Sequence, residues 1–243
     1  MRLTRVYIDT PPLVGERLAV AGSAANHIVR VLRLRTGDAL TLFDGRGGEY
    51  AGSVQEIRRD EVLVDVLEHH PLERESPLRL TLAQGISRGE RMDWVIQKAT
   101  ELGVSCIAPL FTARSIVQLD AKQAQKKLQH WRSIAVAACE QSGRNRVPQI
   151  TLPEGLYEFL GTDAAGGCRL LLAPRAGLRL ADVSQTDTGV TVLIGPEGGL
   201  AENEQESAAA AGFTPVRLGP RVLRTETAAI AALTLLQQKF GDL

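Results

Sequence analysis

Two glycine-containing loops near the C-terminus carry the residue types best suited to chemistry. The first reads GPEGG at residues 195–199 and follows the strongly apolar run 190–194; the second reads LGPRVLR at residues 218–224 and precedes the last apolar helix. Glycine lets a backbone approach a ligand closely and exposes N–H groups to it. Successive strands of a parallel sheet end at one edge, so these loops can flank one pocket. The spacing therefore predicts a ligand site between them.

The charged residues beside these loops indicate what kind of ligand fits. The motifs match neither the dinucleotide fingerprint nor the phosphate loop, and Glu202 and Glu204 fall in the first turn of the next predicted helix. Carboxylates at that position repel a phosphate. An uncharged or zwitterionic ligand is therefore expected, and Arg224 is a candidate to stabilise negative charge on a substrate.

A third motif offers an alternative chemistry. Residues 85–89 read GISRG, which places Ser87 in the G-x-S-x-G pattern of a serine hydrolase. Such an enzyme needs an acid and then a histidine after the serine. The only later histidine, His130, falls in a polar predicted helix rich in Lys and Gln. The hydrolase remains an alternative, and a plain strand-to-helix turn is favoured.

The elements that must position these motifs fall into two parts. Residues 1–70 predict short strands at 6–8, 39–43, 50–57 and 62–67, interrupted by one helix that Ser23 would cap and in which Ile28, Val31, Leu32 and Leu34 form an apolar stripe. Residues 71–77 carry two prolines and predict a linker. Residues 78–243 alternate strand-like runs at 78–83, 104–110, 169–173, 190–194 and 214–218 with helical segments. That alternation is typical of a parallel α/β sheet, with Thr225 expected to cap the last helix.

The composition narrows the class of protein. The chain has 243 residues, 44% of them hydrophobic, and 28 basic residues balance 28 acidic ones, which excludes a disordered or histone-like protein. The net charge of the whole chain is zero, but residues 114–146 carry an excess of basic side chains and residues 150–212 carry an excess of acidic ones. Three widely spaced cysteines suggest neither a disulfide framework nor a zinc site, and no metal is expected. Without a secretory signal or an apolar stretch long enough to span a bilayer, the expected location is cytoplasmic.

Five motifs together resemble a known family. They are residues 193–199 and 218–228, then QKATELGV at 97–104, EQSGR at 140–144, and residues 27–33 followed by LFDG at 42–45. Their order and spacing resemble the RsmE-type RNA methyltransferases of the SPOUT superfamily, which methylate N3 of a uridine in 16S, small-subunit ribosomal RNA. The resemblance covers nearly the whole chain.

The resemblance implies an architecture and a cofactor. A small β-barrel RNA-binding domain of PUA-like type would occupy residues 1–70, and a trefoil-knotted parallel-sheet methyltransferase domain would occupy residues 78–243. S-adenosylmethionine would be the methyl donor. The partners would be ribosomal RNA or the assembled small ribosomal subunit, and the protein would be a homodimer.

The resemblance also assigns roles to residues near the two loops. The donor would be held by Leu172, Ala173, Ile194, Gly195, Pro196, Glu197, Gly198, Gly199, Leu218, Gly219, Val222, Leu223 and Thr225. Uracil N3–H is only weakly acidic, so its proton must be removed and the developing charge stabilised. Arg224 is the candidate for charge stabilisation, and Glu197 or Glu226 is the candidate base.

Basic side chains in both parts are expected to contact RNA phosphates, which position a nucleic acid without reading its sequence. They are Arg5, His27, Arg30, Arg33, Lys98, Arg114, Arg144 and Arg146. A non-catalytic RNA-binding or ribosome-assembly protein would share these residues. It would not need two glycine loops at one sheet edge, and donor binding separates the two hypotheses.

Overall fold

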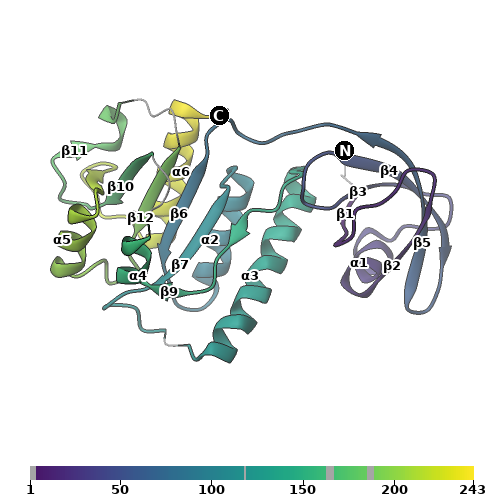
Figure 1. Cartoon of the computed structure of the whole chain (residues 1–243), viewed down its shortest axis with the longest axis horizontal. Coiled ribbons are helices and arrows are strands. Elements are labelled where there is room, and N and C mark those ends of the chain that lie inside the picture. The colour runs from purple at the N-terminus through teal and green to yellow at the C-terminus, as the bar shows by residue number, and fades with distance from the viewer. Residues whose placement is uncertain (1–3, 118, 163–166, 185–188) are drawn as a thin grey trace. The chain divides into compact units, whose positions relative to one another are not determined.

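The chain folds into two compact units in a computed structural model that describes residues 4–117, 119–162, 167–184 and 189–243 (Figure 1). The first unit comprises Met1–Glu75 and Val136–Val147, and the second comprises Ser76–Ala135 and Pro148–Leu243. The segment Val136–Val147 thus packs with the first unit although it lies far along the chain. The boundaries expected from the sequence, with a linker at 71–77, stay a prediction.

The first unit is built on a small curled sheet with the strand order β1-β3-β4-β5-β2. β1 runs parallel to β3, and the other neighbours are antiparallel. No ladder joins the edge strands β1 and β2 within the described residues, so the predicted small barrel is a curled, open sheet. The elements are β1 (Arg5–Tyr7), β2 (Arg17–Ala21), α1 (Gly22–Asn26), the π-helix η1 (His27–Leu32), β3 (Ala39–Phe43), β4 (Glu49–Ile57) and β5 (Glu61–His70).

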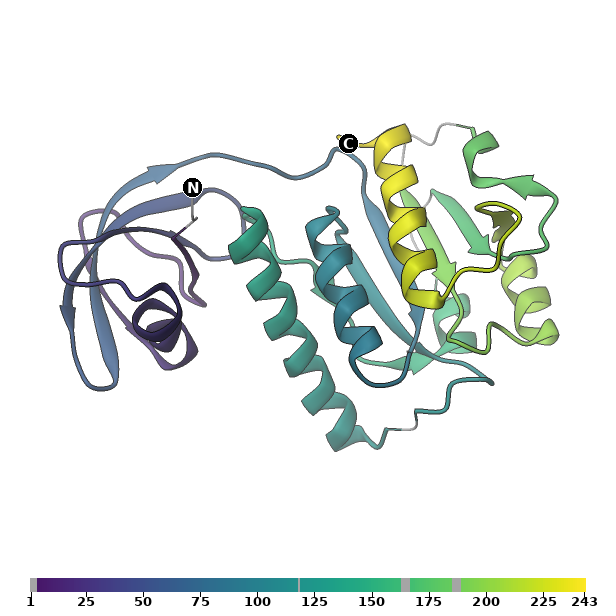
Figure 2. The ribbon, with the colours of Figure 1, turned by 180° about the vertical axis from the view of Figure 1, so that it is seen from behind.

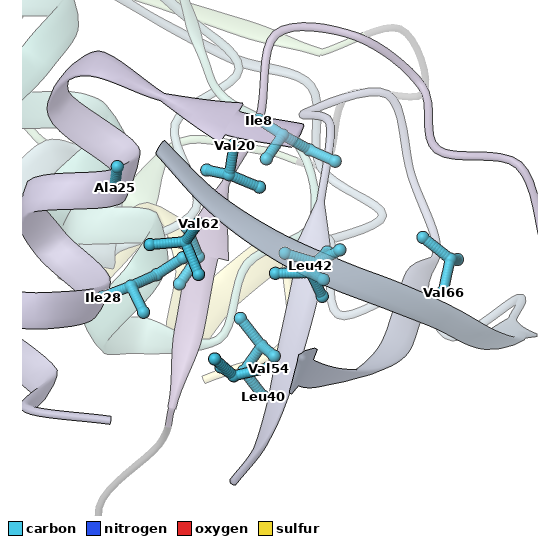
Figure 3. Packing of buried hydrophobic residues seen from close by; sticks show 11 residues of the cluster. Ile8, Val20, Ala25, Ile28, Leu40, Leu42, Val54, Val62 and Val66 are labelled. Atoms are coloured by element: carbon cyan, nitrogen blue, oxygen red, sulfur yellow. The ribbon is translucent and has the colours of Figure 1, made fainter. Parts of the chain in front are cut away.

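Alternating apolar residues fold this sheet around one core. Side chains two residues apart point to the same face of a strand, so Leu40 and Leu42 of β3 and Val62 and Val64 of β5 are all buried on the inside. Figure 3 shows these strands contributing to one cluster, with Ile28 of η1 beside Val62. The helical segment formed by α1 and η1 therefore packs on the inner, apolar face of the curled sheet.

The second unit is an eight-stranded parallel sheet with the order β11-β13-β10-β12-β6-β7-β8, and β9 pairs with β7. The parallel α/β class expected from the sequence is confirmed. The strands are β6 (Leu80–Gly85), β7 (Cys106–Phe111), β8 (Gln149–Ile150), β9 (Glu154–Gly155), β10 (Cys168–Leu172), β11 (Leu178–Arg179), β12 (Val190–Ile194) and β13 (Thr214–Arg217).

Helices cover both faces of this sheet. α2 and α6 lie side by side on one face, and α4 and α5 lie on the other (Figures 1 and 2). α2 buries apolar residues that recur at helical spacing. These residues include Val95, Ile96 and Ala99. The helices are α2 (Glu90–Glu101), α3 (Ala121–Ser142), α4 (Leu156–Gly161), the 3₁₀ turn η2 (Leu180–Asp182), α5 (Glu202–Ala210) and α6 (Thr225–Phe240).

Two expected helix caps are wrong. Ala21, not Ser23, is the N-cap of α1, and Arg224, not Thr225, is the N-cap of α6. The Thr225 hydroxyl does not cap the helix because it donates to a carbonyl of the first glycine loop. The short elements β2, β8, β9, β11 and α4 were not expected. The trefoil knot stays a prediction. Within the described ranges, no helix combines the length and apolar character needed to cross a membrane.

Candidate active site

The sheet order of the second unit creates a cavity at the carboxyl ends of three strands. β10 lies between β12 and β13, so the segments that follow these strands open side by side. The cavity has a volume of about 1340 Å³ and is lined by residues that follow β10, by the first glycine loop (residues 195–199) and by the second glycine loop (residues 218–224). This is the edge where parallel sheets place their ligand sites. The predicted pocket between the loops is therefore present.

Every residue expected to hold a cofactor lines this cavity. The set is Leu172, Ala173, Ile194, Gly195, Pro196, Glu197, Gly198, Gly199, Leu218, Gly219, Val222, Leu223 and Thr225. Three residues expected to act in catalysis, Arg224, Glu197 and Glu226, line it as well. Val222 is 80% exposed, which makes it an apolar side chain at the surface of the second loop. The structure brings both predicted sets into one concave site, and their functions stay proposals.

Gln84 and Thr225 tie the two glycine loops together. The Thr225 hydroxyl donates to the Gly195 carbonyl oxygen at 2.7 Å. Gln84, a fully buried side chain in the penultimate residue of β6, donates through Nε2 to Thr225 Oγ1 at 3.0 Å and to the Gly195 carbonyl at 3.4 Å. Buried polar groups that satisfy one another fix backbone positions. The start of α6 and the first loop are therefore held in one arrangement.

The first glycine loop folds back so closely that side chains are excluded from it. A Cβ on Gly195 would stand 2.8 Å from the backbone of Gly199 and Leu200. Gly199 has a φ of +66°, which is the left-handed region that favours glycine. Backbone geometry on the cavity wall thus requires glycine at position 195 and favours it at position 199.

Arg114 and Glu204 brace the outer side of that loop. Arg114 donates through Nη1 to the Gly198 carbonyl oxygen at 2.9 Å. The Glu204 carboxylate, 1% exposed, accepts from the backbone N–H groups of Ala113 at 2.7 Å and Ala201 at 2.8 Å. Glu204 therefore serves the backbone and does not line the cavity, whereas Glu202 does. Of the two acids expected to repel a phosphate, only Glu202 is in position to do so.

The two carboxylates expected to act as a base have different surroundings. Glu197 Oε1 accepts from the backbone N–H of Arg88 at 2.9 Å and from Arg91 Nη1 at 2.8 Å. Burial by itself raises the pKa of Glu197, but these bonds, together with its own backbone N–H, lower that pKa below its ordinary value. Glu226 Oε2 is buried without a hydrogen-bond partner, and Glu226 Oε1 lies 4.0 Å from Arg91 Nε.

Arginine dominates the charged lining of the cavity. Three of these residues, Arg175, Arg221 and Arg224, are exposed and form no ion pair with any described residue. Arg217 instead donates to the carbonyl oxygens of Ala176 and Gly177, both at 2.6 Å, and so holds the segment after β10. The unpaired guanidinium groups give the site a surplus of positive charge near its exposed rim.

Two of the arginines expected to contact RNA are buried in the first unit. Arg5 is 3% exposed; it pairs with Glu49 and donates to Asn145 Oδ1 at 2.5 Å. Arg144 is 4% exposed and pairs with Glu75 through Nη2 at 2.5 Å. A buried, paired guanidinium is not accessible to a phosphate, so neither residue offers a free charge for the expected RNA contact, and neither is proposed for it below. They instead hold Val136–Val147 to the rest of the unit.

The other expected RNA contacts are at least partly accessible. Arg30 and Arg33 are exposed on and after η1, and no ion pair joins either to a described residue. His27, Lys98 and Arg146 each lie near one carboxylate: Glu140 at 3.5 Å, Glu101 at 2.8 Å and Glu73 at 3.0 Å. Arg114 lines the cavity, as described above. RNA binding by these residues stays a prediction.

The geometry opposes the hydrolase alternative. Ser87 is buried, and its hydroxyl donates weakly to the Gly85 carbonyl oxygen at 3.5 Å. The His130 ring pairs with Asp93 at 2.8 Å, and no hydrogen bond joins it to Ser87 in the described part of the chain. A serine nucleophile needs its base within hydrogen-bond reach. The hydrolase interpretation is therefore not proposed.

Several residues of the cavity or its walls were not predicted from the sequence. Gln84, Arg91, Arg175, Arg217 and Arg221 were not among the expected residues. Two of them carried a signal: Gln84 is a polar residue in an otherwise apolar strand, and Arg91 places a cation in the first turn of a helix, where the helix dipole disfavours it. Each has a polar partner that explains its position.

Comparisons with known proteins identify the family of this chain. The family model of the RNA methyltransferase domain matches residues 74–237, and that of the RNA methyltransferase PUA domain matches residues 20–67. The chain is 36% identical to the ribosomal RNA small subunit methyltransferase E of Buchnera aphidicola, covering 100% of this chain and 98% of the relative. It is 33% identical to the enzyme of that name from Bacillus subtilis, covering 97% and 94%.

Solved structures with a bound methyl donor share the whole fold. The ribosomal RNA small subunit methyltransferase E of Neisseria gonorrhoeae, bound to S-adenosyl methionine, superposes with a TM-score of 0.93 at 36% identity, covering 99% of each chain. A protein from Legionella pneumophila in complex with the bound cofactor SAM gives a TM-score of 0.96 at 41% identity, covering 100% of each chain. The resemblance read from the five motifs is confirmed: the chain belongs to the RNA methyltransferase family whose members are named ribosomal RNA small subunit methyltransferase E.

Proposed function

We propose that this protein transfers a methyl group from S-adenosylmethionine to N3 of a uridine in 16S, small-subunit ribosomal RNA. The observation that carries the proposal is the cavity between the two glycine loops, which unites all the residues expected to hold the donor. Relatives over the full length of the chain bear the name of a small-subunit ribosomal RNA methyltransferase. The N3 position and the uridine rest on the motif resemblance.

The residues of the cavity fit such a donor. A Cβ on Gly219 meets no atom within 4 Å, so this glycine leaves open space beside the backbone of the second loop. Apolar side chains of Leu172, Ile194 and Leu223 suit an adenine ring, while the carboxylates of the lining suit the positive charges of the donor. When bound, the donor supplies a methyl group made electrophilic by an adjacent sulfonium. We infer that these backbone and apolar groups hold and orient it.

Arg224 is the proposed stabiliser of negative charge on the uracil. It is exposed at the cavity, directly precedes α6 and has no ion-pair partner among the described residues. A guanidinium is always charged and can donate two bonds to carbonyl oxygens of a base. Its position supports donation to the oxygens beside N3, where charge develops when the proton leaves.

The RNA is proposed to be held by both parts of the chain. Residues 1–70 would form the PUA-like RNA-binding domain, residues 71–77 the linker and residues 78–243 the knotted methyltransferase domain. Arg30, Arg33 and Arg114 are the accessible basic candidates without a carboxylate partner. We further propose a homodimer that acts in the cytoplasm on ribosomal RNA or on the assembled small subunit.

A methyl-transfer assay tests the proposal directly. Purified protein and S-adenosylmethionine carrying an isotopic label on the methyl group are incubated with unmethylated 16S RNA, and separately with small subunits. Digestion to nucleosides followed by mass spectrometry is expected to show labelled 3-methyluridine. Label in another nucleoside would refute the N3 assignment. Donor binding without transfer to either substrate would refute the proposed reaction and favour a non-catalytic RNA-binding protein.

A further inference from the structure

The two carboxylates at the cavity differ in how many hydrogen bonds they already accept. Glu197 Oε1 accepts from the backbone N–H of Arg88 and from the side chain of Arg91. Glu226 accepts no hydrogen bond from any residue that the structure describes: its Oε2 is buried without a partner, and its Oε1 stands 4.0 Å from Arg91 Nε, beyond hydrogen-bond distance. One carboxylate already accepts two hydrogen bonds through one oxygen, and the other retains its full accepting capacity.

This difference determines which carboxylate can take a proton. Hydrogen bonds to a carboxylate stabilise its charged form and weaken it as a base. Glu197 would have to give up some of these bonds to accept a proton, and the loop that they hold would loosen. Leaving a buried acceptor without a hydrogen bond costs free energy. A donor that reaches Glu226 is therefore favoured to bond to it.

Arg91 connects the two carboxylates from a third element. It comes from the first turn of α2, donates to Glu197 at 2.8 Å and faces Glu226 at 4.0 Å. One guanidinium therefore holds the first glycine loop by a hydrogen bond and attracts the carboxylate of α6 through its charge. At that separation Arg91 restrains Glu226 without occupying its oxygens.

We propose that Glu226 is the general base that takes the N3 proton of the target uridine, and that Arg91 is a positioning residue that holds Glu226 and Glu197 at the cavity. The inference rests on the proposed function and deepens it. The terminal torsion of a glutamate is broad, so either oxygen can face the substrate. Glu197 is a structural carboxylate in this assignment.

The proposed step moves a proton from N3 to Glu226 and a methyl group from sulfur to N3. The N3–H bond breaks and its proton passes to the Glu226 carboxylate, which becomes a neutral carboxylic acid. The electron pair left on N3 forms the bond to the methyl carbon. The bond between that carbon and sulfur breaks with its electron pair retained by sulfur, so the sulfonium becomes a neutral thioether. Arg224 stabilises the charge that develops on the uracil oxygens as the proton leaves.

The first experiment compares Glu226→Gln with Glu197→Gln at saturating donor and RNA. Loss of a general base typically costs about 100-fold or more in rate, so kcat of Glu226→Gln is expected to fall by at least that factor. Glu226→Asp, which retains a carboxylate, should recover part of the loss. Calorimetric binding of S-adenosylmethionine verifies that each variant is folded. A Glu226→Gln enzyme that binds the donor and keeps kcat within a few-fold of wild type would overturn the proposal.

A more acidic target base separates a chemical role from a structural one. Fluorine at C5 of uracil withdraws electrons and makes N3–H easier to remove. RNA carrying 5-fluorouridine at the target is expected to narrow the gap in kcat between Glu226→Gln and wild type. It should leave the ratio of Glu197→Gln to wild type unchanged. An equal gap on both RNAs would overturn the assignment of Glu226 as the base.

The role of Arg91 is tested by a pH profile. The charged groups that line the cavity with Glu226 include Arg91 of α2, Glu197 of the first glycine loop and Arg224 of the second. Removing the Arg91 cation removes an attraction that favours the carboxylate, so the acid limb of kcat should move to higher pH in Arg91→Gln. Arg91→Lys should move it back toward wild type. An unshifted limb in Arg91→Gln would overturn the positioning role.

Failure of this inference is distinguishable from failure of the proposed function. If wild-type protein makes no 3-methyluridine, the proposed function itself fails, whatever the variants do. If wild type makes it and Glu226→Gln makes it equally fast, only the assignment of the base fails. The nucleoside measurement on wild type is therefore made first.

Discussion

The arginines of the two units differ in what they do for the protein. In the first unit Arg5 and Arg144 are almost fully buried, and each is matched by a carboxylate. Around the cavity of the second unit Arg175, Arg221 and Arg224 are exposed and have no ion-pair partner in the described ranges. A buried charge that is paired belongs to the fold, whereas an exposed, unpaired charge beside a cavity is available to a ligand. Burial and pairing, and not residue type, separate the two roles.

The largest effect is expected when a buried pair is broken. Arg5→Met leaves Glu49 with only its partner Arg74 and leaves Asn145 Oδ1 without the Arg5 bond. Removing one member of a buried ion pair costs about 3–5 kcal/mol in the free energy of unfolding. Hydrogen exchange followed by mass spectrometry on peptides of β3 to β5 should show that loss in the first unit.

An exposed pair in the same unit provides the control for Arg5. Arg58 is about half exposed and pairs with Glu56 and Glu61, so Arg58→Met should change the free energy of unfolding by less than about 1 kcal/mol. Equal losses in the two variants would contradict the view that burial decides the structural role.

A rim arginine should show the opposite behaviour. Arg224→Ala removes charge stabilisation without breaking any pair, so kcat is expected to fall by roughly 100-fold while the free energy of unfolding is unchanged. Methyl transfer at saturating donor and thermal unfolding measure the two quantities. Arg179→Ala is the matched control, because Arg179 is exposed in the same unit and pairs with Asp182. If Arg224→Ala lowers the free energy of unfolding and leaves kcat normal, Arg224 has a structural role like that of Arg5 and Arg144.

The tie between the two glycine loops should affect donor affinity. Thr225→Val removes the bond to the Gly195 carbonyl and the acceptor used by Gln84. A buried hydrogen bond lost in this way costs about 1–3 kcal/mol, so the donor Kd should rise roughly tenfold by calorimetry. Thr225→Ser keeps the hydroxyl and should restore affinity. Thr227→Val, an exposed site two residues later, should change nothing. If the donor Kd of Thr225→Val equals that of wild type, the hydrogen bonds between the two loops are not needed for donor binding.

The smallest effect concerns two glutamates with opposite pH dependence. Burial raises the pKa of Glu140 in the first unit, although a backbone bond from Tyr7 and the nearby His27 oppose the rise. The pKa of Glu197 in the second unit is lowered, because hydrogen bonds and Arg91 outweigh its burial. A raised carboxyl pKa costs stability as pH rises from the unfolded-state pKa through the folded-state pKa. A lowered pKa costs stability as pH falls through the folded-state pKa.

Urea unfolding between acidic and neutral pH distinguishes these two signs. The free energy of unfolding of wild type minus that of Glu140→Gln should decrease as pH rises. The corresponding difference for Glu197→Gln should increase as pH rises. Parallel trends would mean that the surroundings of the two carboxyls do not differ as the structure indicates.

Much of the fold followed from local patterns. The limits of β3 and β12 coincide with the apolar runs at 39–43 and 190–194, and α2 and α3 each end within two residues before a glycine, Gly103 and Gly143. These elements are regular enough for hydrophobic period and glycine termination to identify them. Two-residue strands such as β8 and β9 have no period, and they exist only because β7 offers a free edge for pairing.

The candidate site was predictable where it depended on backbone chemistry. The residue pattern was sufficient to place two glycine loops after the last parallel strands, because glycine and proline specify turns through local geometry alone. It could not determine that Arg5 and Arg144 are buried while Arg224 is exposed, since arginines look alike in a sequence. Only tertiary packing decided that Gln84 would tie the loops and that Arg91 would stand between Glu197 and Glu226. Those contacts join residues more than a hundred positions apart, and their energies depend on burial and distance, which arise only when the chain has folded.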